Sequence, residues 1–60
     1  MTRAEIIKVL QAAEEIDPGG YCCAEHDILY VVPEVMTEEQ AKRLSDLGCH
    51  IDCGSYAVYT

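Results

Sequence analysis

The sequence predicts an α+β protein with two layers, in which a helix, a β-hairpin, a second helix and a second hairpin follow one another (αββαββ). Three observations predict this class: two amphipathic stretches that each begin with a capping box, one short block of β-branched and aromatic residues, and a hairpin pattern at the end of the chain. We expect a four-stranded antiparallel sheet with both helices on one face, which leaves the other face partly in water. With 60 residues, the chain is expected to form a single domain over residues 1–60.

The first helix is predicted to begin after Thr2 and to end near Ile16. Thr2 and Glu5 have the spacing of a capping box, in which two free backbone N–H groups are satisfied by side chains. Pro18 disfavours helical geometry at Asp17, and two glycines follow, so a turn is expected there. The apolar stripe of this helix is expected to consist of Ile6, Val9, Leu10, Ala13 and Ile16.

The central strand is predicted over residues 28–32, the only uninterrupted apolar block that is rich in β-branched and aromatic residues. Residues 21–24 are expected to form a shorter strand that pairs with it through a tight turn at residues 25–27. A linker over residues 34–36 is expected to lead to the second helix.

The second half begins with another capping box, formed by Thr37 and Gln40. Ala41, Leu44 and Leu47 are expected to face the core, and Gly48 is expected to end the helix. After it, Gly54 and Ser55 suit a two-residue type II′ turn. That turn places three pairs on the core face: Cys53 with Tyr56, Ile51 with Val58, and Cys49 with Thr60.

The chain is strongly acidic, with eleven Asp and Glu against four Lys and Arg and a formal charge of −7. This charge argues against non-specific binding to nucleic acid or to an anionic membrane, and it favours a basic partner surface. The sequence has no signal-peptide pattern and no apolar stretch of transmembrane length. A cytoplasmic protein with reduced thiols is therefore expected.

Four cysteines and two histidines raise the question of a metal site. The motifs Cys22-Cys23-x-x-His26 and Cys49-His50-x-x-Cys53 have the residue types of a zinc site. Their spacing argues against zinc, because residues 49 and 53 would lie roughly 13 Å apart on an extended strand. We therefore expect no metal and no cofactor, with the cysteines free and buried or half-buried as small apolar residues. A disulfide between the first hairpin and the last strand is the remaining alternative.

Catalytic chemistry has little support in the sequence. His26 with Asp27, and His50 with Asp52, suggest acid–base pairs, but no nucleophile is tied to either pair. A chain of this size also rarely encloses a substrate pocket. The protein is therefore not expected to be an enzyme.

The acidic residues give a better indication of function. Glu14 and Glu15 are expected at the C-terminal end of the first helix, where the dipole disfavours them, so helix stability does not explain them. The acids are either a solvated surface or an anionic surface that imitates phosphate charge, with exposed tyrosines among Tyr30, Tyr56 and Tyr59 as apolar anchors. The predicted partner-binding residues are Glu25, Asp27, Tyr30, Glu34, Glu38, Glu39, Asp52 and Tyr59.

A resemblance extends this interpretation. The segment Gly20-Tyr21-x-x-Ala24-Glu25-His26-Asp27-x-Leu29-Tyr30-Val31, followed by Thr37-Glu38-Glu39 and Leu44-x-x-Leu47-Gly48-x-His50-x-Asp52, is similar to small acidic phage and prophage proteins. In size and acidity the chain also resembles anti-CRISPR proteins. The resemblance implies a non-catalytic inhibitor that binds the nucleic-acid-binding surface of a type I CRISPR–Cas complex in the bacterial cytoplasm, as a DNA mimic. A monomer or weak dimer is expected. The alternatives are a metal-stabilised interaction module and a self-associating protein that buries its open sheet face.

Overall fold

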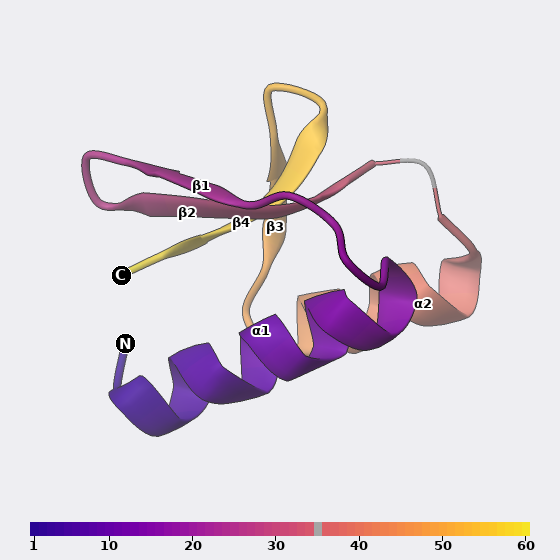
Figure 1. Ribbon diagram of the computed structural model, residues 1–60, viewed down its shortest axis with the longest axis horizontal. Helices are drawn as coiled ribbons and strands as arrows, with labels where there is room; N and C mark the ends of the chain where they lie inside the picture. Colours follow the sequence, from indigo (N-terminus) through magenta and orange to yellow (C-terminus); the bar gives the residue numbers. More distant parts are fainter. Residues whose placement is uncertain (35) are drawn as a thin grey trace.

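The computed structural model describes residues 1–34 and 36–60 and contains two helices and four strands. The helices are α1 (Arg3–Ile16) and α2 (Glu38–Asp46), and the strands are β1 (Cys23–Glu25), β2 (Ile28–Pro33), β3 (His50–Asp52) and β4 (Ser55–Tyr59). The strands form one antiparallel sheet in the order β1-β2-β4-β3, and both helices lie on one face of it (Figure 1). The predicted α+β class and element order are confirmed, while Val35, in the predicted linker, lies outside the described residues.

Both helices begin at the predicted capping boxes. The Thr2 hydroxyl accepts a hydrogen bond from the Glu5 backbone N–H at 3.2 Å, and the Glu5 carboxylate accepts one from the Thr2 N–H at 3.0 Å. Thr37 and Gln40 make the same two bonds at 3.2 and 3.1 Å. Each pair satisfies two backbone groups that a helix start leaves without partners. Neither described helix is long and apolar enough to cross a membrane.

The core lies between the helices and the inner strands of the sheet. Its buried residues are Val9, Ala12, Ala13, Val31, Val32, Leu44, Cys49, Tyr56 and Val58. The predicted stripe of α1 was partly wrong, because Ala12 is fully buried and Leu10 is 38% exposed. The reason is that α1 packs against α2 as well as β2, which turns the buried side of the helix towards Ala12.

The first hairpin differs from the prediction in its first strand. β1 begins at Cys23, and the two-residue turn consists of His26 and Asp27, with a positive φ of 56° at His26. Tyr21 lies outside the strand and is 86% exposed. β2 extends over the predicted central strand and has a bulge between Tyr30 and Val32, so both Val31 and Val32 are buried.

The predicted register of the last hairpin was wrong by two residues. The turn is formed by Cys53 and Gly54, both with positive φ (54° and 77°), as a type I′ turn requires. As a result Ile51 pairs with Tyr56, and His50 with Ala57. A shift of two residues keeps the strand side chains on their predicted faces, so Cys49, Tyr56 and Val58 are buried as expected, whereas Cys53 moves from the predicted core face into the turn. Ile51 is 52% exposed, because β3 is an edge strand.

Candidate protein-binding surface

The sheet face turned away from the helices, which we call the open face, carries a compact group of polar and aromatic side chains. Side chains alternate between faces along a strand, and Leu29 and Val58 pack into the helix-side core. Their neighbours in the strands therefore project from the open face. This face consists of Cys23, Glu25, Ile28, Tyr30, His50, Asp52, Ala57 and Tyr59.

The centre of the open face is built over a small residue. Ala57 pairs with Tyr30 on one side and with His50 on the other, and it is fully buried although it faces away from the helices. The Tyr30 hydroxyl donates a hydrogen bond to the Asp52 carboxylate at 3.1 Å, so this side chain reaches across β4 from β2 to β3. The His50 ring stacks on Tyr59, with ring centroids 4.7 Å apart. These contacts hold the Tyr30, His50 and Tyr59 rings in place on the open face.

Asp52 also sets the chemistry of its neighbours. The hydrogen bond that Tyr30 donates to Asp52 raises the pKa of the phenol, and burial and the charges of Asp52 and Glu25 add to this. The Cys53 thiol donates a hydrogen bond to the other carboxylate oxygen of Asp52 at 3.5 Å. That bond raises the pKa of the Cys53 thiol in the same way. Burial raises the pKa of the Cys49 thiol. The shifts favour the protonated form of all three groups.

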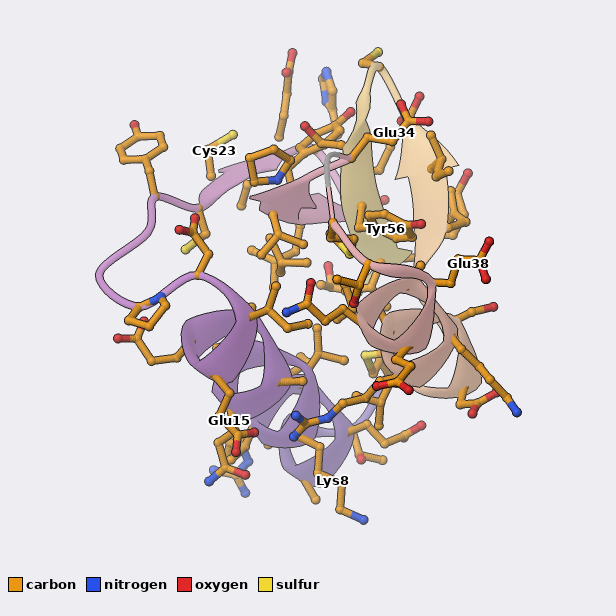
Figure 2. The ribbon with its side chains drawn as sticks, turned by 90° about the vertical axis from the view of Figure 1, so that its right-hand side faces the viewer. Lys8, Glu15, Cys23, Glu34, Glu38 and Tyr56 are labelled. Atoms are coloured by element: carbon orange, nitrogen blue, oxygen red, sulfur yellow. The ribbon has the colours of Figure 1, made fainter. Side chains whose placement is uncertain are left out.

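Charge is divided between the two layers of the molecule. All four Lys and Arg residues lie on the helices: Arg3 and Lys8 on α1, Lys42 and Arg43 on α2. The strands and their connecting segments, over residues 17–34 and 49–60, contain acids but no Lys or Arg. Figure 2 shows Cys23 and Glu34 on the sheet side and Lys8 and Glu15 on the opposite, helical side. The sheet side therefore has a net negative charge.

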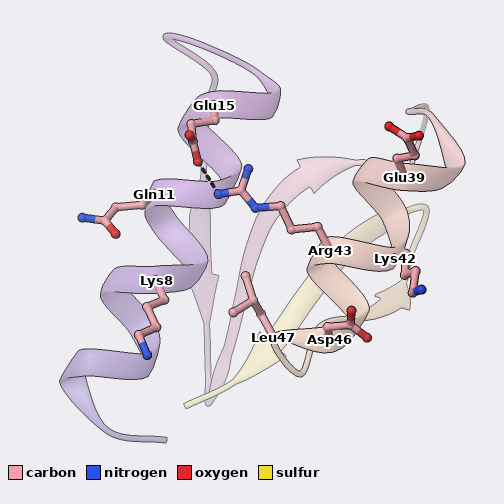
Figure 3. Close-up of a pocket in the computed structure, with 8 residues that line it drawn as sticks. All are labelled: Lys8, Gln11, Glu15, Glu39, Lys42, Arg43, Asp46 and Leu47. Carbon is pink, nitrogen blue, oxygen red and sulfur yellow. Dashed lines mark hydrogen bonds and ion pairs between the residues drawn. The ribbon is translucent and has the colours of Figure 1, made fainter.

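Three of the four basic side chains line a groove between the helices (Figure 3). Lys8, Lys42 and Arg43 line this groove together with Glu15, Glu39 and Asp46, so its charges balance. Arg43 forms an ion pair with Glu15 across it. Both side chains are largely exposed, and such a pair contributes about 1 kcal/mol or less.

The structure brings together four of the eight predicted partner-binding residues. Glu25, Tyr30, Asp52 and Tyr59 share the open face, and Asp27 lies in the adjoining β1–β2 turn. Glu34 lies beyond the other end of β2, where its N–H donates to the Gly54 carbonyl at 3.1 Å. Glu38 and Glu39 begin α2, and Glu39 lines the interhelical groove. The predicted residues therefore do not form one continuous surface.

Glu14 and Glu15, which the helix dipole disfavours at the C-terminal end of α1, both make contacts within the chain. The Glu14 carboxylate accepts a hydrogen bond from the Gly19 N–H at 2.9 Å, and Glu15 pairs with Arg43. The helix-dipole argument did not predict these local contacts, which come from the turn after α1 and from α2. Among the described residues, five predicted site acids have side chains that make no hydrogen bond or ion pair within the chain: Glu25, Asp27, Glu34, Glu38 and Glu39.

The tyrosines divide into core and surface residues. Tyr56 is 8% exposed and belongs to the core, so it is not an anchor, whereas Tyr59 is 63% exposed. Sequence reasoning missed Tyr21 as a surface residue, because a strand was expected to begin there. The available signal was the preceding Gly19-Gly20 pair, which favours irregular chain between α1 and the first strand.

The cysteines are exposed where the sequence predicted burial, except at one position. Cys49 is buried as expected, but Cys22, Cys23 and Cys53 are exposed, and all four are free thiols. The prediction was wrong for these three because none lies inside the sheet. Cys22 precedes β1, Cys23 begins that edge strand, and Cys53 lies in the β3–β4 turn. No group of three or more His, Cys, Asp or Glu among residues 1–34 and 36–60 is placed to hold a metal ion.

Comparisons with protein-family models, with curated proteins and with solved structures found no match. The open face and the distribution of charge are therefore the observations that bear on function. Together they describe a preformed anionic surface with aromatic groups at its centre.

Proposed function

We propose that this protein is an acidic inhibitor that binds the basic nucleic-acid-binding surface of a partner protein. The resemblance to anti-CRISPR proteins suggests a CRISPR–Cas subunit of the bacterial host as that partner. The observation that carries the proposal is the division of charge, with every Lys and Arg on the helices and a sheet side that is anionic. Such a surface occupies a basic groove by imitating phosphate charge.

The open face supplies the two kinds of contact that such binding needs. Its unpaired carboxylates, with Glu25 on the face and Asp27 in the adjoining turn, are available to Lys and Arg of the groove. Tyr59, 63% exposed and stacked on His50, supplies an ordered aromatic anchor. Because the charges are exposed, the encounter is expected to be fast at low salt and to weaken as salt rises.

A pull-down from a bacterium with active CRISPR–Cas systems tests the proposal. The tagged protein is expected to capture a nucleic-acid-binding subunit at low salt, to lose it at high salt, and to compete with double-stranded DNA for it. Capture of no such subunit, or of one that still binds DNA in the complex, would overturn the proposal.

Matched charge variants locate the binding surface. Glu25→Gln with Asp27→Asn removes two charges from the sheet side, whereas Glu38→Gln with Glu39→Gln removes two from α2. Since these side chains are exposed and have no hydrogen-bond or ion-pair partner within residues 1–34 and 36–60, both double variants are expected to fold. The first is expected to weaken capture about tenfold or more, and the second only slightly. Equal effects would show that the open face is not the contact surface.

Self-association is a second candidate, and one observation favours it. Ile51 is 52% exposed on the edge strand β3, whose outer backbone groups have no strand partner among the described residues. An edge of this kind is able to pair with a second copy. Sedimentation at high protein concentration distinguishes the cases, because a monomeric mass excludes this candidate.

A further inference from the structure

A hollow of about 300 Å³ lies where the open face meets the chain that leaves α1. Two tyrosines, a proline and an acid contribute to its lining, which includes Asp17, Tyr21, Cys23, Tyr30, Pro33 and Ser55. Its walls are mainly apolar, and no Lys or Arg lines it. The proposed function does not by itself assign this hollow a role.

The two tyrosines present aromatic surface to the hollow in different ways. Tyr21 is 86% exposed and free to adjust, whereas Tyr30 is half-buried and fixed by its hydrogen bond to Asp52. A cation placed over an aromatic face is attracted by the negative charge density of the ring. One fixed ring and one adjustable ring therefore suit a cationic group that enters from solvent.

Asp17 gives the hollow its charge. It caps the C-terminal end of α1 and is half-buried, yet its carboxylate makes no hydrogen bond or ion pair within the described residues. Gly20 leaves room for this carboxylate, because a Cβ at residue 20 would overlap it. Partial burial of a carboxylate without a cation or donor is unfavourable, so a cationic ligand stabilises it.

We propose that this hollow receives the guanidinium group of an arginine from the partner. The planar cation would stack on Tyr30 and Tyr21 while its N–H groups donate to the Asp17 carboxylate. Arginine fits better than lysine, because its flat, weakly hydrated head stacks on rings and donates several hydrogen bonds in one plane. This inference rests on the proposed function, since it names the group of a basic partner surface that the chain recognises.

The test uses the free protein and N-acetyl-arginine amide as the probe, with binding followed through backbone amide signals in NMR spectra. Saturable shifts are expected at Tyr21, Cys23 and Ser55 in the millimolar range. Asp17→Asn keeps the shape of the side chain and is expected to weaken binding about tenfold. Tyr21→Ala, which alters only an exposed ring, is expected to weaken it severalfold.

Two controls make the result decisive. Asp46→Asn also removes one charge, but at the last residue of α2, and is expected to leave the affinity within about twofold. N-acetyl-lysine amide is expected to bind severalfold more weakly than the arginine probe. Absence of saturable shifts, equal binding of both probes, or unchanged binding by Asp17→Asn would overturn the inference.

The outcome is separable from that of the proposed function. If the subunit is captured but the arginine probe does not bind, only the assignment of the hollow fails. If the probe binds but no nucleic-acid-binding subunit is captured, the proposed partner fails while the hollow is shown to bind arginine.

Discussion

Asp52 is the residue that links the open face together. Its two carboxylate oxygens accept hydrogen bonds from Tyr30 of β2 and from Cys53 of the β3–β4 turn. One side chain thus fixes a ring and a turn that come from different hairpins. Local sequence did not predict this role, because residues 30 and 52 meet only when β4 lies between their strands.

Replacement of Asp52 is expected to change the titration of Tyr30. The pKa of the Tyr30 phenol lies above its ordinary value of 10.0 chiefly because the phenol donates to Asp52. The protonated phenol is therefore the form that stabilises the fold. Its contribution is fully present below the unfolded pKa and is lost as the pH rises through the folded pKa. In Asp52→Asn, we expect Tyr30 to titrate closer to 10.0, as measured by NMR through the assigned ring signals of Tyr30, which separate it from the other three tyrosines.

Asp27→Asn provides the matched control, since it also removes one charge from the sheet side but, among the hydrogen bonds of the described residues, makes none to Tyr30. It is expected to leave the titration of Tyr30 nearly unchanged. Identical curves for wild type and Asp52→Asn would contradict the assignment of this hydrogen bond as the main cause.

At the scale of the elements, the helix starts were predicted correctly because they depend on residues close together in the sequence. Both capping boxes depend on residues three apart, so their partners are brought together by the helix alone. The last hairpin was harder, because Gly54-Ser55 and Cys53-Gly54 are both plausible two-residue turns. The choice between them depends on strand twist and on a positive φ at Cys53, which no residue pattern in this segment required.

The first capping box gives a prediction on stability and pH. The pKa of Glu5 is lowered, first by the hydrogen bond from the Thr2 backbone and then by that from its hydroxyl. Glu5 therefore stabilises the fold above its unfolded pKa, and this contribution is lost as the pH falls through the lower folded value. Glu5→Ala is expected to be less stable than wild type at neutral pH. The difference should shrink in acid when urea unfolding is measured across this range.

Glu38→Ala serves as the comparison, because Glu38 also lies in the first turn of a helix but makes no capping bond. It is expected to cost less than Glu5→Ala at neutral pH and to show a weaker pH dependence. A pH-independent loss in Glu5→Ala would argue against the capping role.

At the scale of the whole molecule, a few fully buried side chains carry the core. Leu44 of α2, Val9 of α1 and Val58 of β4 are buried almost completely, and each comes from a different element. A domain of this size has little stability to spare. The core is therefore the part of the chain that is most sensitive to substitution.

Leu44→Ala is expected to destabilise the protein by about 2–5 kcal/mol, through lost burial and the cavity left behind. Ile7→Ala removes an equally apolar side chain of α1 that is 53% exposed, and is expected to change stability by about 0.5 kcal/mol or less. Chemical denaturation followed by circular dichroism measures both. Similar losses in the two variants would mean that the core is not centred on Leu44.

The candidate site was predictable only in part, for a reason that belongs to the whole fold. Alternation along strands placed Asp52 and Tyr59 on the solvent side of the last hairpin, and the structure agrees. That Glu25 and Tyr30 join them depends on the pairing of β2 with β4, which the sequence did not specify. The hollow could not be predicted from the sequence for the same reason, since Asp17 and Tyr30 both line it only in the folded chain.

The strand order has a consequence for the symmetry of the open face. With β2 and β4 paired at the centre, the two hairpins lie on either side of the pair Tyr30 and Ala57. The hairpins are paired alike, because Cys23 lies opposite Tyr30 as His50 lies opposite Ala57, and the turn residues His26 and Cys53 share a positive φ. The side chains at the central pair differ, with a large ring at residue 30 and a methyl group at residue 57. The open face is therefore one-sided, so a partner bound there, as proposed above, is expected to take a single orientation.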